Sequence, residues 1–379
     1  MSSYRIEVFD RRSQLDAISG LRRRVFGGTA AFNRAYLKWK YLENPYVPEP
    51  LIYVAWLGDQ AAGMRGFYGT SWDVPGSEQR LIIPCAADLG IAEDHRDRGL
   101  FDDLTDFAFA DLKGRGFPYV INMSATPANY VTSIMAMGWK SLGSYEPLVR
   151  STAAESKTGS RPAASISAPA IDRLRARLKA SPRTRALVRR LRDARPKQTA
   201  SGAGFEALDR SAEGTSLLIE VQPQPAVMAK IAANQARDAR FSHVRDEHYF
   251  RWRYRNPAST YRFLFRAGDD PDAYLVLQQR AVRPTRLVDW GGREGGCAEL
   301  LDELIRLAPP AQLSTWGATV SAPFRSYLGE AGFVLDKREG RRGMLVRDLG
   351  SADGEDPIGQ SRPLDSSHWD LRMICSDRF

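Results

Sequence analysis

Residues 81–116, LIIPCAADLGIAEDHRDRGLFDDLTDFAFADLKGRG, are the stretch that decides the fold. The apolar run at 81–91 predicts a buried strand, and 99–116 predicts an amphipathic helix that ends in glycine. A short polar loop containing Gly99 joins them. A strand that delivers a glycine-containing turn to a helix N-terminus creates an anion site, because the first helical N–H groups and the helix dipole point at it. This arrangement suits a diphosphate.

The first 150 residues alternate strands and helices around that stretch. Strands are predicted at 4–9, 119–125 and 141–150, a hairpin at 51–74, and helices at 11–27, 32–45 and 129–139. The strand at 141–150 is expected to close the first sheet. The fold class is therefore α/β (α+β), with mixed sheets.

The loop resembles the GNAT superfamily of acyl-CoA transferases, in which the fourth strand is followed by Arg/Gln-x-x-Gly-x-Gly/Ala. The matching run is Arg96 to Phe101. The resemblance implies acetyl-CoA as cofactor, with its pantetheine arm along the preceding strand and its diphosphate on the loop. The implied cofactor-binding residues are Leu89, Ile91, Arg96, Asp97, Arg98, Gly99, Leu100, Phe101 and Asn129. Two residues depart from the family pattern. Phe101 stands where the family usually has Gly or Ala, and Asp97 stands where Gly is common.

Acyl transfer from a thioester to an amine needs a base for the ammonium proton and an acid for the departing thiolate. Asp88, beside the pantetheine strand, is the first candidate base and Glu93 the second. The family often has a tyrosine acid where this sequence has Ile134. Tyr130 and Tyr145 are the candidate replacements, and each is also a candidate packed aromatic.

A short repeat indicates that the pattern restarts in the second half. Residues 36–41, YLKWKY, precede Asn44-Pro45, and residues 249–254, YFRWRY, precede Asn256-Pro257. We interpret the repeat as a duplicated helix whose aromatic residues anchor it to a sheet or line an acceptor groove. The predicted organisation is a GNAT domain at 1–150, a linker and Arg-rich helical segment at 151–200, a degenerate GNAT-like domain at 201–355, and an extension at 356–379.

The charge and the metal-ligating residues of the sequence limit the kinds of partner that the chain is expected to bind. The net charge is +9, and residues 171–197 hold eleven Arg or Lys against two Asp, so the charge is local. That segment could be a solvated face, a membrane-surface contact or a site for an anion or nucleotide. Three scattered cysteines and four histidines give no metal-ligand spacing. Because no apolar run is long enough to span a bilayer, we expect a cytoplasmic location. Peripheral contact of the protein with the inner membrane face is a second option.

The sequence thus predicts an acetyl-CoA-dependent N-acetyltransferase acting on an amine, with an amino sugar of cell-surface polysaccharide as the expected acceptor. The acceptor is expected to be a small molecule or lipid-linked, and nucleic acid is not an expected partner. Two alternatives stay open. One is a Fem-like transferase that uses aminoacyl-tRNA. The other is a non-catalytic module that binds an anionic lipid or a nucleotide such as cyclic-di-GMP through the Arg-rich segment.

Overall fold

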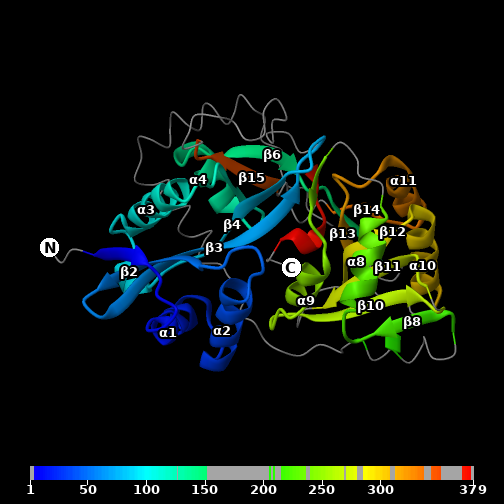
Figure 1. The fold of residues 1–379 in the computed structure, drawn as a ribbon, viewed down its shortest axis with the longest axis horizontal. Coiled ribbons are helices and arrows are strands. Elements are labelled where there is room, and N and C mark those ends of the chain that lie inside the picture. The colour runs from blue at the N-terminus through cyan, green and yellow to red at the C-terminus, as the bar shows by residue number, and fades with distance from the viewer. Residues whose placement is uncertain are drawn as a thin grey trace.

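The computed structural model describes residues 4–125, 127–151, 205, 208–209, 215–235, 240–268, 270–279, 285–307, 312–336, 343–350 and 369–376. The Arg-rich segment 171–197, the linker beyond Ser151 and most of the expected extension 356–379 lie outside these residues. The described residues form two mixed sheets with helices on both faces, which confirms the α/β class (Figure 1).

The first half follows the predicted alternation. Its elements are β1 (Arg5–Val8), α1 (Leu15–Phe26), α2 (Ala30–Leu37), the π-helical turn η1 (Lys38–Leu42), β2 (Leu51–Leu57), β3 (Gln60–Asp73), β4 (Arg80–Ile91), the 3-10 turn η2 (Glu93–His95), α3 (Leu100–Gly114), β5 (Tyr119–Asn122), α4 (Pro127–Ala136) and β6 (Lys140–Ser144). Local chemistry sets several ends, since Thr29 caps α2 by accepting a hydrogen bond from the Phe32 amide.

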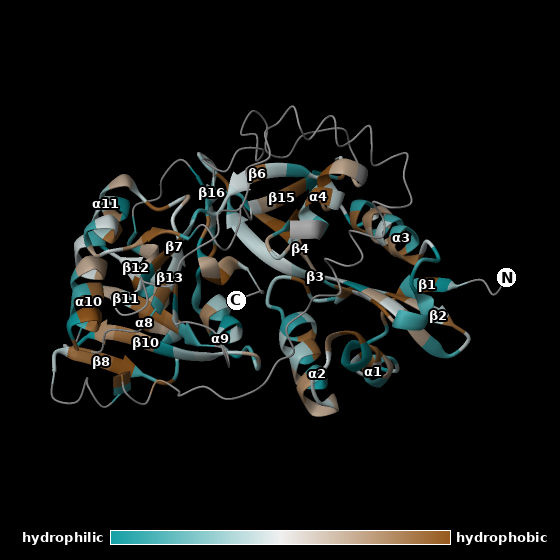
Figure 2. Cartoon of the chain, turned by 180° about the vertical axis from the view of Figure 1, so that it is seen from behind, coloured by the Kyte–Doolittle hydropathy of each residue, from teal (hydrophilic) through white to brown (hydrophobic). Residues whose placement is uncertain are grey.

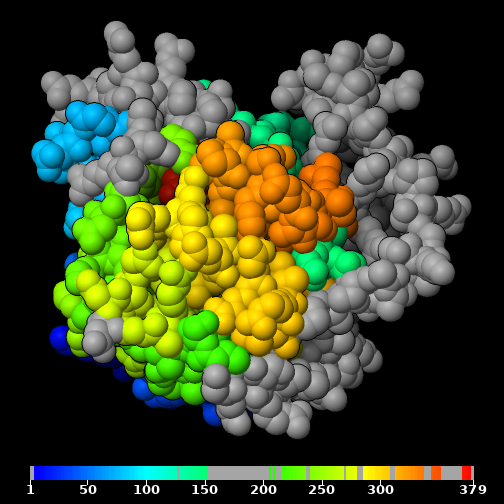
Figure 3. Space-filling model, turned by 90° about the vertical axis from the view of Figure 1, so that its right-hand side faces the viewer, coloured from blue at the N-terminus to red at the C-terminus, as the bar shows by residue number. Residues whose placement is uncertain are grey.

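The second half repeats the alternation. Its elements are β8 (Leu217–Glu220), α8 (Pro225–Ala233), β9 (Phe241–His243), α9 (Glu247–Arg253), β10 (Thr260–Arg266), β11 (Ala273–Gln279), β12 (Thr285–Gly292), α10 (Glu294–Leu307), β13 (Gln312–Trp316), α11 (Ala322–Glu330), β14 (Val334–Leu335) and β15 (Gly343–Asp348). A C-terminal stretch adds β16 (Trp369–Asp370) and the 3-10 turn η4 (Met373–Cys375). Figure 3 shows the outer side of this half, where the surface of α10 and α11 is yellow-orange to orange.

The two sheets exchange strands. The first has the order β1-β2-β3-β4-β5-β15-β6, and the second β14-β7-β13-β12-β11-β10-β8, with β7 spanning Pro147–Ser151. The prediction of one closing strand at 141–150 is wrong, because the chain turns at Glu146, which has a φ of 48°, and β7 then enters the second sheet. In return, β15 pairs with β5 and β6 of the first sheet. Neither sheet is therefore built from one continuous stretch of chain.

The sheets share a core through their inner faces. One buried cluster joins side chains from α1, α2 and η1 to side chains from α8, α9, β10 and β11. The outer face of the first sheet packs against α3, and that of the second against α10 and α11. In Figure 2 brown, apolar segments mark the interior strands, while teal gathers on the outer turns of the helices. The C-terminal stretch lies between the halves, near the centre of Figure 1.

The duplicated hexamers meet at this centre. The Trp39 indole donates to the Trp252 carbonyl at 2.8 Å, and the Trp252 indole donates to the Trp39 carbonyl at 2.6 Å. The two rings stack with centroids 5.8 Å apart. Both tryptophans are buried. The repeat thus anchors the two halves to each other, and these buried tryptophan rings do not line an open acceptor groove.

Candidate active site

The loop after β4 forms an open corner at the N-terminus of α3. Asp97 and Gly99 both have positive φ, 60° and 78°, and Gly99 is the N-cap of the helix. The left-handed region costs glycine little, which explains the residue at 99. A Cβ placed on Gly99 would meet no atom within 4 Å, so the space in front of the corner is free. The first amides of α3 point toward this space, as the dipole argument requires.

A strand edge leads from the centre of the sheet to that corner. The register between β4 and β5 contains one pair, Cys85 with Ile121; β5 ends at Asn122, whereas β4 continues to Ile91. The middle of β4 is buried, but Leu89 and Ile91 are only half-buried. Leu89 and Ile91 are thus partly accessible, and their contact with a pantetheine arm stays a prediction.

The remaining predicted cofactor residues lie on the loop and on α4. Asp97, Arg98 and Gly99 are exposed, Leu100 is buried in the core, and Phe101 is half-buried. Arg96 turns back and donates from Nε to the Ile91 carbonyl at 3.4 Å. Asn129 is exposed in the first turn of α4.

His95 precedes the loop, in η2, and is 4% exposed. Its Nδ1 lies 2.9 Å from the Tyr4 hydroxyl, and the two rings pack edge to face. His95 therefore supports the loop from beneath and does not face the open corner.

Asp88 lies in the strand beside the cleft, as predicted, but it is the centre of a buried ionic cluster. Its carboxylate accepts from Lys40 Nζ at 3.0 Å, from the Tyr41 hydroxyl at 2.7 Å and from Arg22 Nη2 at 3.3 Å. Although desolvation by burial acts in the opposite direction, Lys40 and Arg22 hold the pKa of Asp88 well below its usual range. A carboxylate bound so strongly as an anion is a poor proton acceptor. The assignment of Asp88 as general base is therefore corrected to a structural role.

The other catalytic candidates are dispersed. Glu93 is exposed in η2, directly before the loop that carries Gly99. Tyr130 is half-buried on α4, and its hydroxyl contacts the Ser141 hydroxyl. Tyr145 is buried and stacks on Trp316 of the second half at 3.8 Å between centroids. Tyr145 therefore packs between the sheets, which removes it as a candidate acid for a reaction beside β4.

Sequence reasoning missed the cations that surround Asp88. Lys40 is fully buried and belongs to the YLKWKY hexamer, whose pattern indicated only an aromatic anchor. A similar cluster occurs in the second half, where Asp289 pairs with Arg245 and Arg372 and accepts from Tyr254. The equivalence of Tyr41 and Tyr254 in the two hexamers was the available signal for it.

The equivalent corner of the second half is tighter at two of its glycines. A Cβ on Gly292 would overlap the Asp272 carbonyl oxygen, and Gly296 lies tight against Ala273. Arg293 forms an ion pair with Asp272 at 2.5 Å across the turn. Gly295 of the same turn faces open space, so the degeneracy of the second half as a cofactor site stays a prediction.

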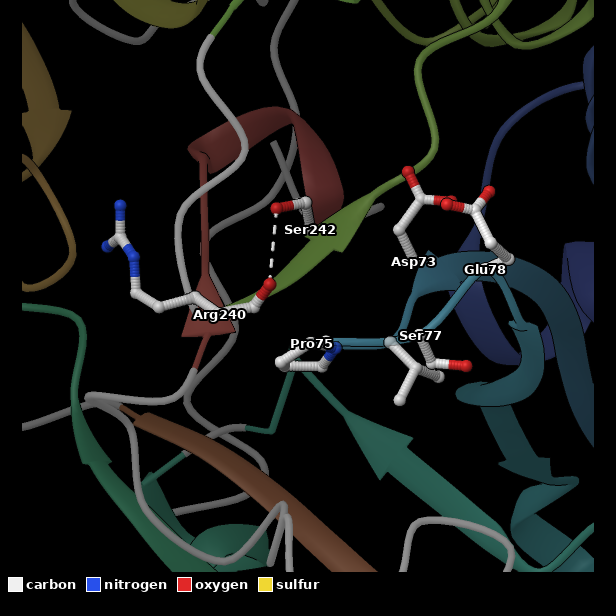
Figure 4. Close-up of a pocket in the computed structure, with 8 residues that line it drawn as sticks. Asp73, Pro75, Ser77, Glu78, Arg240 and Ser242 are labelled. Carbon is white, nitrogen blue, oxygen red and sulfur yellow. Dashed lines mark hydrogen bonds between the residues drawn. The ribbon is translucent and has the colours of Figure 1, made fainter.

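A hollow of about 270 Å³ lies at the other end of the long hairpin, lined by residues 73–78 with Arg240 and Ser242. In Figure 4 the Asp73 and Glu78 carboxylates lie near each other, and the Arg240 guanidinium points away from them. The hairpin turn is separated from the Gly99 corner by the whole length of β4. Its acidic lining would repel a diphosphate, so we do not place the donor there.

Over the described ranges, no three His, Cys, Asp or Glu side chains are grouped so that they could hold a metal ion. In the same ranges, no helix has the length and apolarity required to cross a bilayer.

Known proteins provide an independent comparison. Residues 11–139 match the family described as an acetyltransferase (GNAT) domain. No curated protein matches the chain in sequence.

Solved structures extend the likeness to most of the chain. A GCN5-related N-acetyltransferase from Anabaena variabilis ATCC 29413 is 14% identical, with a TM-score of 0.53, over 92% of this chain and 73% of its own. A conserved protein from Enterococcus faecalis V583, titled a probable N-acyltransferase, is 9% identical with the same TM-score and coverage. Eis1 from Mycobacterium abscessus is 15% identical, with a TM-score of 0.50, over 92% and 74%. At these identities the structures show a shared fold that includes both halves. Residues 11–139 of the chain are thus similar to a GNAT acetyltransferase domain, and the likeness of fold extends over both halves.

Proposed function

We propose that the chain transfers an acetyl group from acetyl-CoA to an amine, with the donor in the cleft between β4 and β5. The observation that carries the proposal is the single β4–β5 pair at Cys85 and Ile121, followed by an open strand edge that ends at the Gly99 corner. A pantetheine arm carries amides that can pair with such an edge. The amides of α3 and the left-handed turn suit its diphosphate.

The reaction follows from this placement. With the diphosphate at the corner, the thioester lies back along β4 toward Asp88. The amine nitrogen attacks the thioester carbon, the carbon–sulfur bond breaks, and the amine loses one proton. Asp88 is held in ion pairs and Glu93 is at the diphosphate end, so we assign the proton to water in the cleft. Tyr130, on the same face as α3, is the proposed acid for the thiolate.

Calorimetry with acetyl-CoA tests the donor site. Wild type is expected to bind, and Gly99→Trp to lose binding because the new ring fills the open corner. Gly116→Trp is the matched control, because Gly116 follows the other end of α3, has a similar φ of 81° and also faces open space. Failure of wild type to bind, or equal binding by Gly99→Trp and Gly116→Trp, would remove the proposal.

The proposed acceptor is an amino sugar used in cell-surface polysaccharide. This part depends on the family resemblance alone, and the buried hexamers add no support for sugar stacking. Release of free CoA thiol with glucosamine, compared with a lysine-containing peptide, separates sugar from peptide amines. For the segment 171–197 we propose contact with an anionic membrane surface, to be tested by co-sedimentation with vesicles that contain or lack anionic lipid.

A further inference from the structure

Arg65 is a buried arginine whose Nε has no hydrogen-bonding partner among the described residues, although the Asp88 charge acts on it from a distance. It lies in β3 and is 6% exposed. Among the described residues no carboxylate forms an ion pair with it. Its recorded contact is with the face of the Phe67 ring, 4.9 Å from Cζ to the centroid. Burial lowers the pKa of its guanidinium to about 10, so the group is still charged at neutral pH.

Three other buried cations in the described part of the chain have partners. Lys40 and Arg22 pair with Asp88, and Arg253 donates to the carbonyls of Ile374 and Ser376. An unpaired buried charge is strongly unfavourable in a folded protein. Such a residue is best explained when a ligand supplies the missing anion.

The register of β3 places Arg65 beside the donor cleft. Gly63 pairs with Ile91, the last residue of β4, and faces Leu100 and Leu104 of α3. Phe67 packs in the same α3-facing core. Because side chains alternate along a strand, Arg65 shares the face of Gly63 and Phe67.

The opposite strand is irregular at this point. The register of β3 with β4 shifts between Met64 and Gly66, so Asp88 and Leu89 lie opposite Arg65. Leu89 belongs to the half-buried edge proposed for the pantetheine arm. Arg65 therefore lies one strand away from the β4 edge, level with the part of β4 between the proposed positions of the thioester and the diphosphate.

We propose that Arg65 is an anion-binding residue in the floor of the donor cleft and pairs with an anionic oxygen group of the acyl-CoA. This inference rests on the proposed function. Two parts of a donor carry such oxygens: the diphosphate of CoA, and a carboxylate at the end of a dicarboxylic acyl chain. A planar guanidinium can donate two parallel hydrogen bonds to either group.

The test compares Arg65→Met with wild type in the full chain. Methionine keeps much of the side-chain volume and removes the charge. Without ligand, the thermal midpoint of Arg65→Met is expected to equal or exceed that of wild type, since an uncompensated charge has been removed. Arg253→Met is the matched control. It removes an equally buried but fully bonded arginine, so it should lower the midpoint and leave donor affinity unchanged.

Calorimetry with CoA, acetyl-CoA and succinyl-CoA then identifies the anion. If the diphosphate is the partner, all three lose about tenfold or more in affinity for Arg65→Met. If an acyl carboxylate is the partner, wild type prefers succinyl-CoA over acetyl-CoA, and Arg65→Met loses only that preference. Arg65→Lys should keep part of the lost affinity in either case.

A failure of the proposed function and a failure of the proposed role of Arg65 give different results. Absence of CoA binding by wild type would refute the proposed function itself. Wild-type binding together with unchanged affinities of Arg65→Met for all three ligands would overturn the role of Arg65 alone. A fall in the ligand-free midpoint as large as that of Arg253→Met would also overturn it, because it would show that the guanidinium is compensated within the protein.

Discussion

Replacement of Asp88 by asparagine should destabilise the fold without removing a catalytic base. The substitution leaves Lys40, fully buried, and Arg22, with 8% of its side chain exposed, without their shared carboxylate. Removal of one partner from a buried ion pair costs about 3–5 kcal/mol. We expect a loss of that size in the free energy of unfolding at pH 7, because an amide can accept from Tyr41 but cannot neutralise two cations.

Asp73→Asn is the matched control. Asp73 lies at the end of the same hairpin and pairs with Arg80 at 3.1 Å, but the side chains are 25% and 53% exposed. Exposed pairs of this kind contribute about 0–1 kcal/mol. Urea unfolding monitored by tryptophan fluorescence should therefore separate the two variants clearly.

The pH dependence gives a second check. The folded pKa of Asp88 is lowered, so its contribution to stability is present above the unfolded pKa of about 3.9 and is lost as pH falls toward the lower folded value. The difference between wild type and Asp88→Asn should be constant from neutral pH down to about pH 5 and shrink below about pH 4.

Kinetics distinguish the structural role from a catalytic one. Below its unfolding temperature, Asp88→Asn should keep the position of the acidic limb of kcat/KM against pH, since the wild-type limb does not report Asp88. Loss of that limb with unchanged stability would refute the reasoning, and so would equal unfolding midpoints for Asp88→Asn and Asp73→Asn.

Three further predictions concern the core. Trp39→Phe and Trp252→Phe each leave a buried carbonyl without its indole donor, and each should lower the free energy of unfolding by about 1–3 kcal/mol. A double-mutant cycle by urea unfolding should show that the two losses are not additive. Gly66→Ala should lower the thermal midpoint because its Cβ would overlap the Tyr41 hydroxyl, whereas Gly20→Ala, in open space within α1, should raise stability by about 0.5–1 kcal/mol. Because all three cysteines are buried, a thiol reagent at pH 8 should label none in the native chain and all in guanidinium, and a native thiol that reacts rapidly would contradict the packing.

The sequence by itself determined the local elements and the corner that binds the donor in our proposal. Apolar periodicity predicted most strands and helices, and the Arg96–Phe101 run indicated a strand, loop and helix N-terminus, which the structure contains. These features depend on residues close together in the chain, so spacing and turn chemistry are enough to reveal them.

Only the tertiary structure decided which strands pair and which charges meet. The exchange of β7 and β15, the reciprocal hydrogen bonds of Trp39 and Trp252, and the ion pairs of Asp88 all join residues far apart in the sequence. A periodic pattern shows that a strand is buried, but it does not show which strands lie beside it. Nor does the sequence show that a lysine in an aromatic hexamer will be buried against a distant carboxylate. The same limit hid Arg65, because the absence of a partner becomes visible only when the surrounding side chains are in place.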